Sequence, residues 1–189
     1  MATQIAILAV MAVFYIAYFT KALQQRKQGV STMILGEGNK PQSEKNIEIC
    51  LKILSFTLPV VEIISIYWNL MDLPLWWQWI GIGVAALGVL FFCAGMLTMK
   101  DSWRAGIPEK KETALVTNGI YRISRNPAFV GFDLLYLGIL AAFPNAWHAC
   151  FVAAAIYTFH RQILNEENYL IRTFGEEYIQ YKNRVRRYL

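Results

Sequence analysis

Two stretches of the sequence bring together residue types that could do chemistry beside a membrane. In GIYRISRNPAFVGFDLLYLG, from Gly119 to Gly138, two arginines, an asparagine and a proline stand directly before an apolar run. In HRQILNEENYL, which begins at His160, a histidine and an arginine precede the paired acids Glu166 and Glu167. Arginines before an apolar run can anchor a membrane span at the membrane–water interface, or they can form part of a site for an anion. These residues alone leave both interpretations open.

The composition indicates a membrane protein. The chain has 189 residues, of which 56% are hydrophobic and 16% are charged, which is short for two domains and too apolar for a typical soluble one. We therefore expect one domain over residues 1–189. The net charge of +5 comes from basic residues between apolar runs, which argues against a nucleic-acid-binding face. The three cysteines, Cys50, Cys93 and Cys150, form no C-x-x-C motif, so we expect no disulfide framework and no metal.

Apolar runs predict an all-α integral membrane bundle of about five transmembrane helices, at residues 5–20, 53–71, 75–99, 129–143 and 147–157. The last two runs are short for the roughly 20 residues of a straight span, and we interpret them as a tight helical hairpin around the sequence PNA. Basic residues follow the first, third and fifth runs, and loops rich in lysine and arginine usually stay in the cytoplasm. We therefore expect the N-terminus outside and the C-terminus in the cytoplasm. A prokaryotic inner membrane is the expected location.

A cytoplasmic C-terminal amphipathic helix is expected in the charged region after Arg161. Tyr178, Tyr181, Val185 and Tyr188 recur at intervals of three and four residues. This spacing places the four side chains on one face of a helix.

Several residues inside the apolar runs have two possible roles. Glu62 is an ionisable residue at membrane depth, which makes it a functional candidate, or it makes a structural hydrogen bond to another span. Asp133 could face an acceptor pocket or reach the membrane interface. Gly81, Gly83 and Gly88 are expected to permit close packing of helices.

The two motif-bearing stretches resemble a known family. Residues 102–189 are similar to the isoprenylcysteine carboxyl methyltransferase and phospholipid methyltransferase superfamily, whose signature is G-x-Y-R-x-x-R-H-P-x-Y-x-G followed by E-E-x-x-L-x-x-x-F-G-x-x-Y-x-x-Y. The resemblance implies that residues 1–99 supply the first three spans and that residues 100–189 form the cofactor-binding catalytic part. It also implies S-adenosylmethionine as methyl donor, S-adenosylhomocysteine as product, and a lipophilic or lipidated acceptor that is reached from the membrane lipid.

The resemblance further implies which residues form the site. A site for S-adenosylmethionine needs apolar or aromatic walls, a carboxylate that accepts from the ribose, and a donor for the ligand's own carboxylate. The residues at the family's cofactor-binding positions are Leu115, Val116, Tyr121, Asn126, Pro127, Phe129 and Glu166. The candidate catalytic residues are Arg125, Arg161 and Glu167, and the candidate substrate-binding residues are Gln162 and Asp133.

Two positions depart from the family pattern. Asn126 stands where the family usually has histidine, and Gln162 stands where the eukaryotic carboxyl methyltransferases have a substrate-orienting arginine. Arg161 comes one residue earlier, which is a turn of about 100° on an α-helix. Arg161 could therefore serve only if the helix is rotated or bent.

The acceptor atom is expected to belong to a carboxylate on a lipophilic molecule. A carboxylate with a pKa of about 4 is ionised at neutral pH, whereas an alkyl amine with a pKa of about 10 must first lose a proton. The arginines could orient an anion, and His160 is the only plausible neutral base nearby. The alternatives are an amine or phospholipid N-methyltransferase, a non-catalytic protein that kept the fold, and an enzyme like the sterol reductases, which would bind a nicotinamide cofactor.

Overall fold

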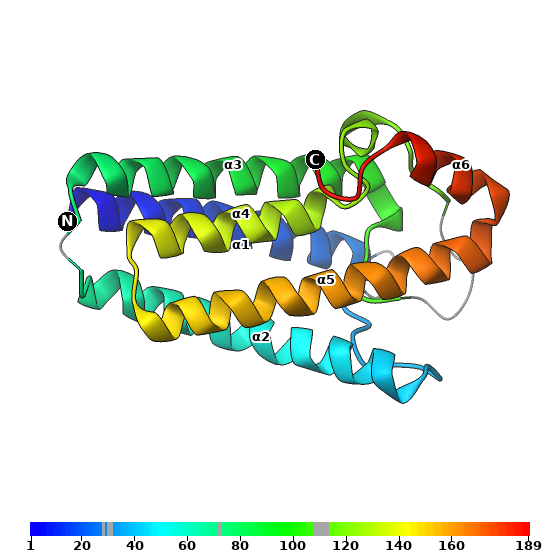
Figure 1. Ribbon diagram of the computed structural model, residues 1–189, viewed down its shortest axis with the longest axis horizontal. Coiled ribbons are helices and arrows are strands. Elements are labelled where there is room, and N and C mark those ends of the chain that lie inside the picture. Colours follow the sequence, from blue (N-terminus) through cyan, green and yellow to red (C-terminus); the bar gives the residue numbers. More distant parts are fainter. Residues whose placement is uncertain (28, 30–31, 72, 108–113) are drawn as a thin grey trace.

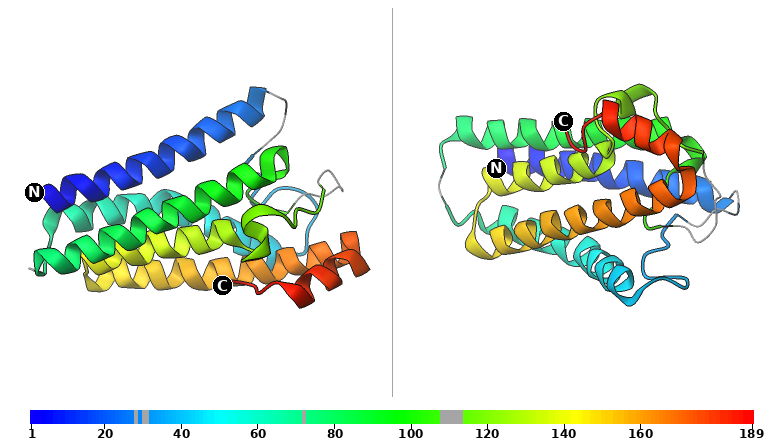
Figure 2. Two further views of the ribbon diagram at one scale, coloured as in Figure 1. Left: turned by 90° about the horizontal axis from the view of Figure 1, so that it is seen from above. Right: turned by 45° about the vertical axis from the view of Figure 1, so that its right-hand side comes forward.

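The computed structural model is an all-helical bundle, as predicted (Figure 1). It describes residues 1–27, 29, 32–71, 73–107 and 114–189. The helices in these ranges are α1 (Ala2–Lys27), α2 (Gln42–Trp68), α3 (Leu75–Met99), α4 (Pro127–Ala142), α5 (Ala146–Phe174) and α6 (Glu176–Arg184), with the short 3-10 helices η1 (Lys100–Ser102) and η2 (Gly119–Arg122). Helices α1 to α5 run alongside one another, and α6 and the loops gather at one end (Figures 1 and 2).

Three of these helices are long and apolar enough to cross a membrane. They are α1, α2 and α3, with mean hydropathies of 2.0, 2.0 and 2.4 over their most apolar windows. These three predicted spans are confirmed. Helix α4 is apolar but has only 16 residues, and α5 joins an apolar first half to a charged second half. The fourth and fifth spans therefore stay predictions.

The connection between α4 and α5 is as tight as the PNA sequence predicts. Helix α4 ends at Ala142 and α5 begins at Ala146. The side chain of Asn145 caps α5 by accepting a hydrogen bond of 2.8 Å from the backbone N–H of His148. This cap satisfies one of the free N–H groups at the helix start.

Two helices are longer than the hydropathy pattern indicates. Helix α2 begins at Gln42, well before residue 53, and α5 continues to Phe174 without a break at residue 157. Both extensions are charged, so apolar length alone underestimates helices that continue beyond a membrane into water. The C-terminal helix α6 is correspondingly short.

Only part of the expected C-terminal amphipathic face lies on α6. Tyr178 and Tyr181 are buried on this helix, but Val185 and Tyr188 lie beyond its end at Arg184. Gly175, with a φ of +57°, separates α6 from α5. The prediction of one helix carrying all four residues is therefore wrong for Val185 and Tyr188.

Glycines allow α3 and α4 to pack with their backbones in contact. A Cβ atom on Gly88 would lie 2.6 Å from the carbonyl oxygen of Gly131, and one on Gly81 would lie 2.7 Å from the backbone nitrogen of Ala142. The packing role predicted for these two glycines is confirmed. The prediction is wrong for Gly83, because a Cβ there would meet nothing within 4 Å.

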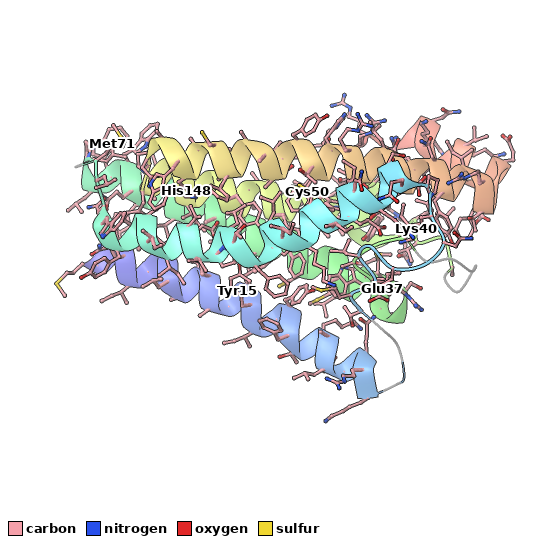
Figure 3. The ribbon with its side chains drawn as sticks, turned by 90° about the horizontal axis from the view of Figure 1, so that it is seen from below. Tyr15, Glu37, Lys40, Cys50, Met71 and His148 are labelled. Carbon is pink, nitrogen blue, oxygen red and sulfur yellow. The ribbon has the colours of Figure 1, made fainter. Side chains whose placement is uncertain are left out.

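A strap of two loops closes one end of the bundle against α2. Its segments, residues 32–40 and 103–107, are joined by backbone hydrogen bonds from Ile34 to Ala105 (3.0 Å) and from Ala105 to Thr32 (2.8 Å). The buried carboxylate of Glu48 accepts from Lys40 Nζ (2.8 Å) and from the backbone N–H groups of both segments. Figure 3 shows Lys40 beside the N-terminal end of α2. The strap is thus fixed by one fully paired buried charge.

We expect Gly131→Ala to destabilise the protein although alanine favours helices. The new Cβ would lie 2.6 Å from the backbone nitrogen of Phe92, and overpacking of this kind costs about 1–3 kcal/mol. Thermal unfolding of the purified protein in detergent measures the effect. Gly83→Ala is the matched control on α3 and should unfold at the same or a slightly higher temperature. Equal unfolding temperatures for the two variants would contradict the close packing of α3 and α4.

Candidate functional site

One cavity of about 540 Å³ joins the end of the bundle that carries the strap to the apolar part between the helices. The half at the strap, which we call the polar half, is lined by Arg104, Leu115, Val116, Tyr121, Arg125, Asn126, Gln162, Glu166, Tyr178 and Tyr181, together with strap residues. Its other half, the membrane half, is lined by Phe14, Tyr15, Tyr18, Phe19, Ser55, Phe56, Pro59, Ile63, Phe132, Tyr136 and Phe159. The cavity can therefore take a ligand with a polar end and a long apolar part.

Tyr121 is positioned by the turn before α4. Gly119 begins η2 with a φ of +57°, a conformation that favours glycine. The backbone carbonyl of Tyr121 accepts a hydrogen bond of 2.7 Å from the hydroxyl of Tyr181. Tyr121, Tyr178 and Tyr181 form a small buried cluster on which Leu115 and Val116 pack. This cluster gives the polar half an aromatic wall.

Gln162 and Glu166 form the opposite wall, one helical turn apart on α5. Gln162 Nε2 donates to Glu166 Oε1 at 3.0 Å, and the side-chain oxygen of Gln162 is buried without a hydrogen-bond partner. Burial raises the pKa of Glu166 to about 7, although the hydrogen bond from Gln162 opposes the shift. The wall therefore offers hydrogen-bond acceptors that the protein itself does not fully use.

Glu167 lies at the centre of a buried ion-pair network. It accepts from Arg125 Nη2 (2.6 Å) and from Arg187 Nε and Nη2 (both 2.9 Å). Burial by itself would raise the pKa of Glu167, but the hydrogen bonds from Arg187 and Arg125 outweigh it and hold the pKa below its usual value. Glu167 is therefore ionised at neutral pH and binds both arginines.

The same network ties the C-terminal segment, residues 185–189, to the start of α4. Arg125 Nη1 donates to the carbonyls of Lys182 (3.0 Å) and Val185 (2.7 Å). Asn126 Nδ2 donates to the carbonyl of Arg187 at 3.1 Å. The C-terminal segment is thus part of the structure that holds Arg125 and Asn126 at the cavity.

Eight of the twelve residues proposed from the sequence line the cavity: Leu115, Val116, Tyr121, Arg125, Asn126, Phe129, Gln162 and Glu166. The other four, Pro127, Asp133, Arg161 and Glu167, are not among the lining residues. Pro127 is the buried first residue of α4 and lies against Gly95. Asp133 is half-buried, and its Oδ1 atom has no hydrogen-bond partner. Arg161 is exposed on α5.

Sequence reasoning missed several lining residues. Tyr178 and Tyr181 were recognised only as a helix face, and Arg104 only as part of a basic segment. Trp103 and the strap residues Met33 and Leu35 also line the cavity. The pairing of the two strap segments follows no helical period, so the sequence pattern carries no signal for it.

His160 lies outside the cavity. Its Nδ1 atom is 2.6 Å from the hydroxyl of Tyr188 in the C-terminal segment, and the two rings are stacked with their centroids 6.2 Å apart. His160 is half-buried and is not among the lining residues. Its contacts are those of a packing residue that helps hold the C-terminal segment.

We expect Glu167→Gln to loosen the C-terminal segment. The neutral amide would leave Arg125, whose side chain is 7% exposed, without its ionic partner, and breaking a buried pair costs on the order of 3 kcal/mol. Trypsin should cleave after Arg184 and Arg186 faster in the variant, and its unfolding temperature should fall. Glu177→Gln, at an exposed acid on α6, should change neither. Unchanged cleavage in the Glu167 variant would show that the network does not hold the segment.

The chain is similar to known proteins of one family. The model of the isoprenylcysteine carboxyl methyltransferase (ICMT) family matches residues 79–172. Human protein-S-isoprenylcysteine O-methyltransferase is 31% identical over 135 residues, covering 70% of this chain and 46% of that protein. The Schizosaccharomyces pombe protein of the same name is 30% identical over 139 residues, covering 72% and 54%. The chain thus spans about half the length of these curated relatives.

A solved structure shares the fold. The eukaryotic intramembrane Ras methyltransferase ICMT superposes with a TM-score of 0.64 at 22% identity, covering 95% of this chain and 63% of that one. This likeness extends over α1 and α2, where the sequence resemblance consists only of apolar residues. The resemblance seen in the two motifs is confirmed, and the chain belongs to the isoprenylcysteine carboxyl methyltransferase family.

Proposed function

We propose that this chain transfers a methyl group from S-adenosylmethionine to the carboxylate of a lipophilic, isoprenylcysteine-like acceptor. The observation that carries the proposal is one continuous cavity with a polar half at the loops and a membrane half between apolar helices. A cofactor from water and a substrate from the membrane can meet in such a cavity. The names of the relatives support carboxyl methylation as the reaction.

The residues of the polar half fit S-adenosylmethionine. Tyr121 and Phe129 offer aromatic faces for an adenine, and Glu166 offers a carboxylate for a ribose diol. The unpartnered side-chain oxygen of Gln162 supplies a further acceptor. We propose Leu115, Val116 and Asn126 as the remaining contacts, and Pro127 as a residue that supports them from the first turn of α4. When bound, the cofactor supplies an electrophilic methyl group on a sulfonium.

Arg104 and Arg125 are the arginines that line the cavity, and we propose that their positive charge orients the acceptor carboxylate. Arg161 is exposed and Glu167 is paired with two arginines. Neither residue contacts the acceptor in this scheme, and any effect on the reaction passes through neighbouring residues. Gln162 would contact the acceptor on its polar side. Asp133, outside the lining, is not needed in this scheme.

Holding the two reactants in line and excluding water are then the main contributions of the protein. The strap helps to exclude water, because Met33, Leu35 and Trp103 line the cavity at the strap. No general base is required, because a carboxylate is already ionised at neutral pH. The contacts of His160 agree with this, since its ring is hydrogen-bonded to Tyr188 outside the cavity.

One observation favours a second candidate function, methylation of a lipophilic amine. The free side-chain oxygen of Gln162 and the carboxylate of Glu166 would both accept hydrogen bonds from an ammonium group. The arginines in the cavity oppose a cation, and we therefore rank carboxyl methylation first. We further propose one domain over residues 1–189, with the N-terminus outside and the polar half facing the cytoplasm of a prokaryote.

We expect S-adenosylhomocysteine to bind more tightly as the pH rises from about 6 to 8. Burial raises the pKa of Glu166 to about 7, so its carboxylate, the form that accepts from a ribose, predominates only above that pH. Losing a charge-assisted hydrogen bond costs on the order of 1.5–3 kcal/mol, which is about tenfold or more in affinity. Calorimetry of Glu166→Gln should therefore show weaker and pH-independent binding. Glu176→Gln, at an exposed acid on α6, should bind like the wild type.

An absence of binding in the folded wild type would favour the non-catalytic alternative. Binding that is unchanged in Glu166→Gln would remove Glu166 from the site while leaving the proposed reaction standing. A titration with a nicotinamide cofactor tests the reductase alternative in the same instrument.

We expect labelled methyl groups to pass to N-acetyl-S-farnesylcysteine as an ester that alkali releases as methanol. At saturating cofactor the rate should be nearly flat from about pH 6.5 to 8.5, because the acceptor is ionised throughout. His160→Ala should keep most of the activity. A rate that climbs about tenfold per pH unit, with an alkali-stable product from a lipophilic amine, would instead establish amine methylation.

A further inference from the structure

The membrane half of the cavity contains hydroxyl groups that the protein does not satisfy. Tyr15 on α1 and Tyr136 on α4 both line it, and no hydrogen bond joins either hydroxyl to another group in the described part of the chain. Figure 3 shows Tyr15 between α1 and α2. Phenol hydroxyls inside a protein usually have a partner, so two unpaired ones on residues that line the same cavity indicate a ligand atom that pairs with them.

Glu62 lies behind these tyrosines on α2. Its side chain is 0% exposed, and neither carboxyl oxygen has a hydrogen-bond partner. It interacts electrostatically with both Tyr15 and Tyr136. A carboxyl group without a partner at membrane depth is costly, and the structural hydrogen bond considered for Glu62 is not formed within the described residues.

The backbone of α2 adds a further acceptor at this level. Pro59 lies inside the helix and has no N–H group, so the carbonyl of Ser55, four residues earlier, lacks its helical hydrogen bond. Ser55 and Pro59 both line the cavity. Helices α1, α2 and α4 thus bring unsatisfied polar groups to one part of a mostly apolar wall.

We propose that Tyr15 and Tyr136, which line the cavity, and Glu62, which lies behind them, form a polar subsite for an uncharged hydrogen-bonding group, a hydroxyl or a carbonyl, on the tail of the lipophilic acceptor. The proposal rests on the proposed function for the identity of the acceptor. A protonated carboxyl and a phenol each donate and accept, which suits an oxygen atom in the ligand. A plain hydrocarbon tail would leave all three groups unpaired.

An uncharged partner fits better than an ion. None of the described residues that line the membrane half is a lysine or an arginine, so an anion bound there would have no counter-charge beside it. A cation would require Glu62 to be ionised at membrane depth, where charge is expensive. A hydrogen bond between an uncharged ligand group and a protonated Glu62 or a phenol requires neither an unpaired anion nor an ionised Glu62.

The helix geometry sets the position of the polar group along the tail. Asn126 follows Arg125, which orients the acceptor carboxylate in the proposed function, and stands at the start of α4. Tyr136 comes ten residues later, which is about 15 Å along the helix. An extended chain covers about 3.5 Å per three bonds, so about 13 bonds separate the acceptor carboxylate from the subsite. In an S-alkylcysteine this corresponds to roughly the tenth carbon of the alkyl chain.

Two positional isomers test the proposal directly. The full chain in detergent is titrated with N-acetyl-S-hexadecylcysteine carrying a hydroxyl at carbon 10 or at carbon 4, so that both ligands have the same composition. The 10-hydroxy isomer should bind about tenfold more tightly, as one additional buried hydrogen bond predicts. Equal affinities would overturn the subsite. Tighter binding of a 10-amino analogue than of the 10-hydroxy isomer would overturn the assignment of an uncharged partner.

Substitutions then test which residues cause the preference for the 10-hydroxy isomer. Glu62→Leu and Tyr136→Phe should each bring the affinity ratio of the two isomers close to one, while Tyr157→Phe, at a 61% exposed tyrosine on α5, should preserve it. A ratio unchanged in both test variants would also overturn the proposal. If a variant does not fold, the comparison of isomers on the wild type still decides. The titrations contain no cofactor, so a failure to bind S-adenosylhomocysteine would count against methyl transfer without affecting this result.

Discussion

The carboxylate of Glu167 holds together the end of the molecule that carries α6 and the C-terminal segment. It joins α5 to Arg125 before α4 and to Arg187 in the C-terminal segment, three parts of the chain that are far apart in sequence. Because an unpaired buried charge is expensive, these contacts form together or are lost together. The turn that carries Tyr121 and the walls of the polar half therefore depend on one ion-pair network that does not itself line the cavity.

Glu166 and Glu167 are adjacent acids on α5, but their different surroundings give them different roles. Glu166 and Glu167 differ by about 100° around the helix, so one lines the cavity and the other faces two arginines. Burial raises the pKa of Glu166 to about 7, whereas hydrogen bonds from arginine keep the pKa of Glu167 low despite its burial. Adjacent acids in a sequence commonly lie on a solvent-exposed helix face. Here Glu166 instead lines the cavity, and Glu167 stabilises the fold through its ion pairs.

Much of the fold could be predicted because helices leave periodic patterns. Apolar runs located α1, α2 and α3, and small residues indicated the packing of Gly81 and Gly88. The sequence could not show which way Gly83 faces, how far α5 continues as a charged helix, or that residues 32–40 pair with 103–107. For the site, the motifs found one side of the cavity, but the contributions of Tyr15, Tyr136 and the strap depend on tertiary packing.

The cavity reaches the outer surface of the bundle between α1 and α2. Phe19 and Phe56 line it and are also 58% and 64% exposed, and in Figure 2 α1 diverges from the bundle toward its end at Lys27. Under the proposed function, an acceptor dissolved in lipid would arrive sideways without crossing water. Its encounter rate would then follow its mole fraction in the bilayer rather than its concentration in the suspension, so adding inert lipid at constant acceptor would dilute the substrate in two dimensions.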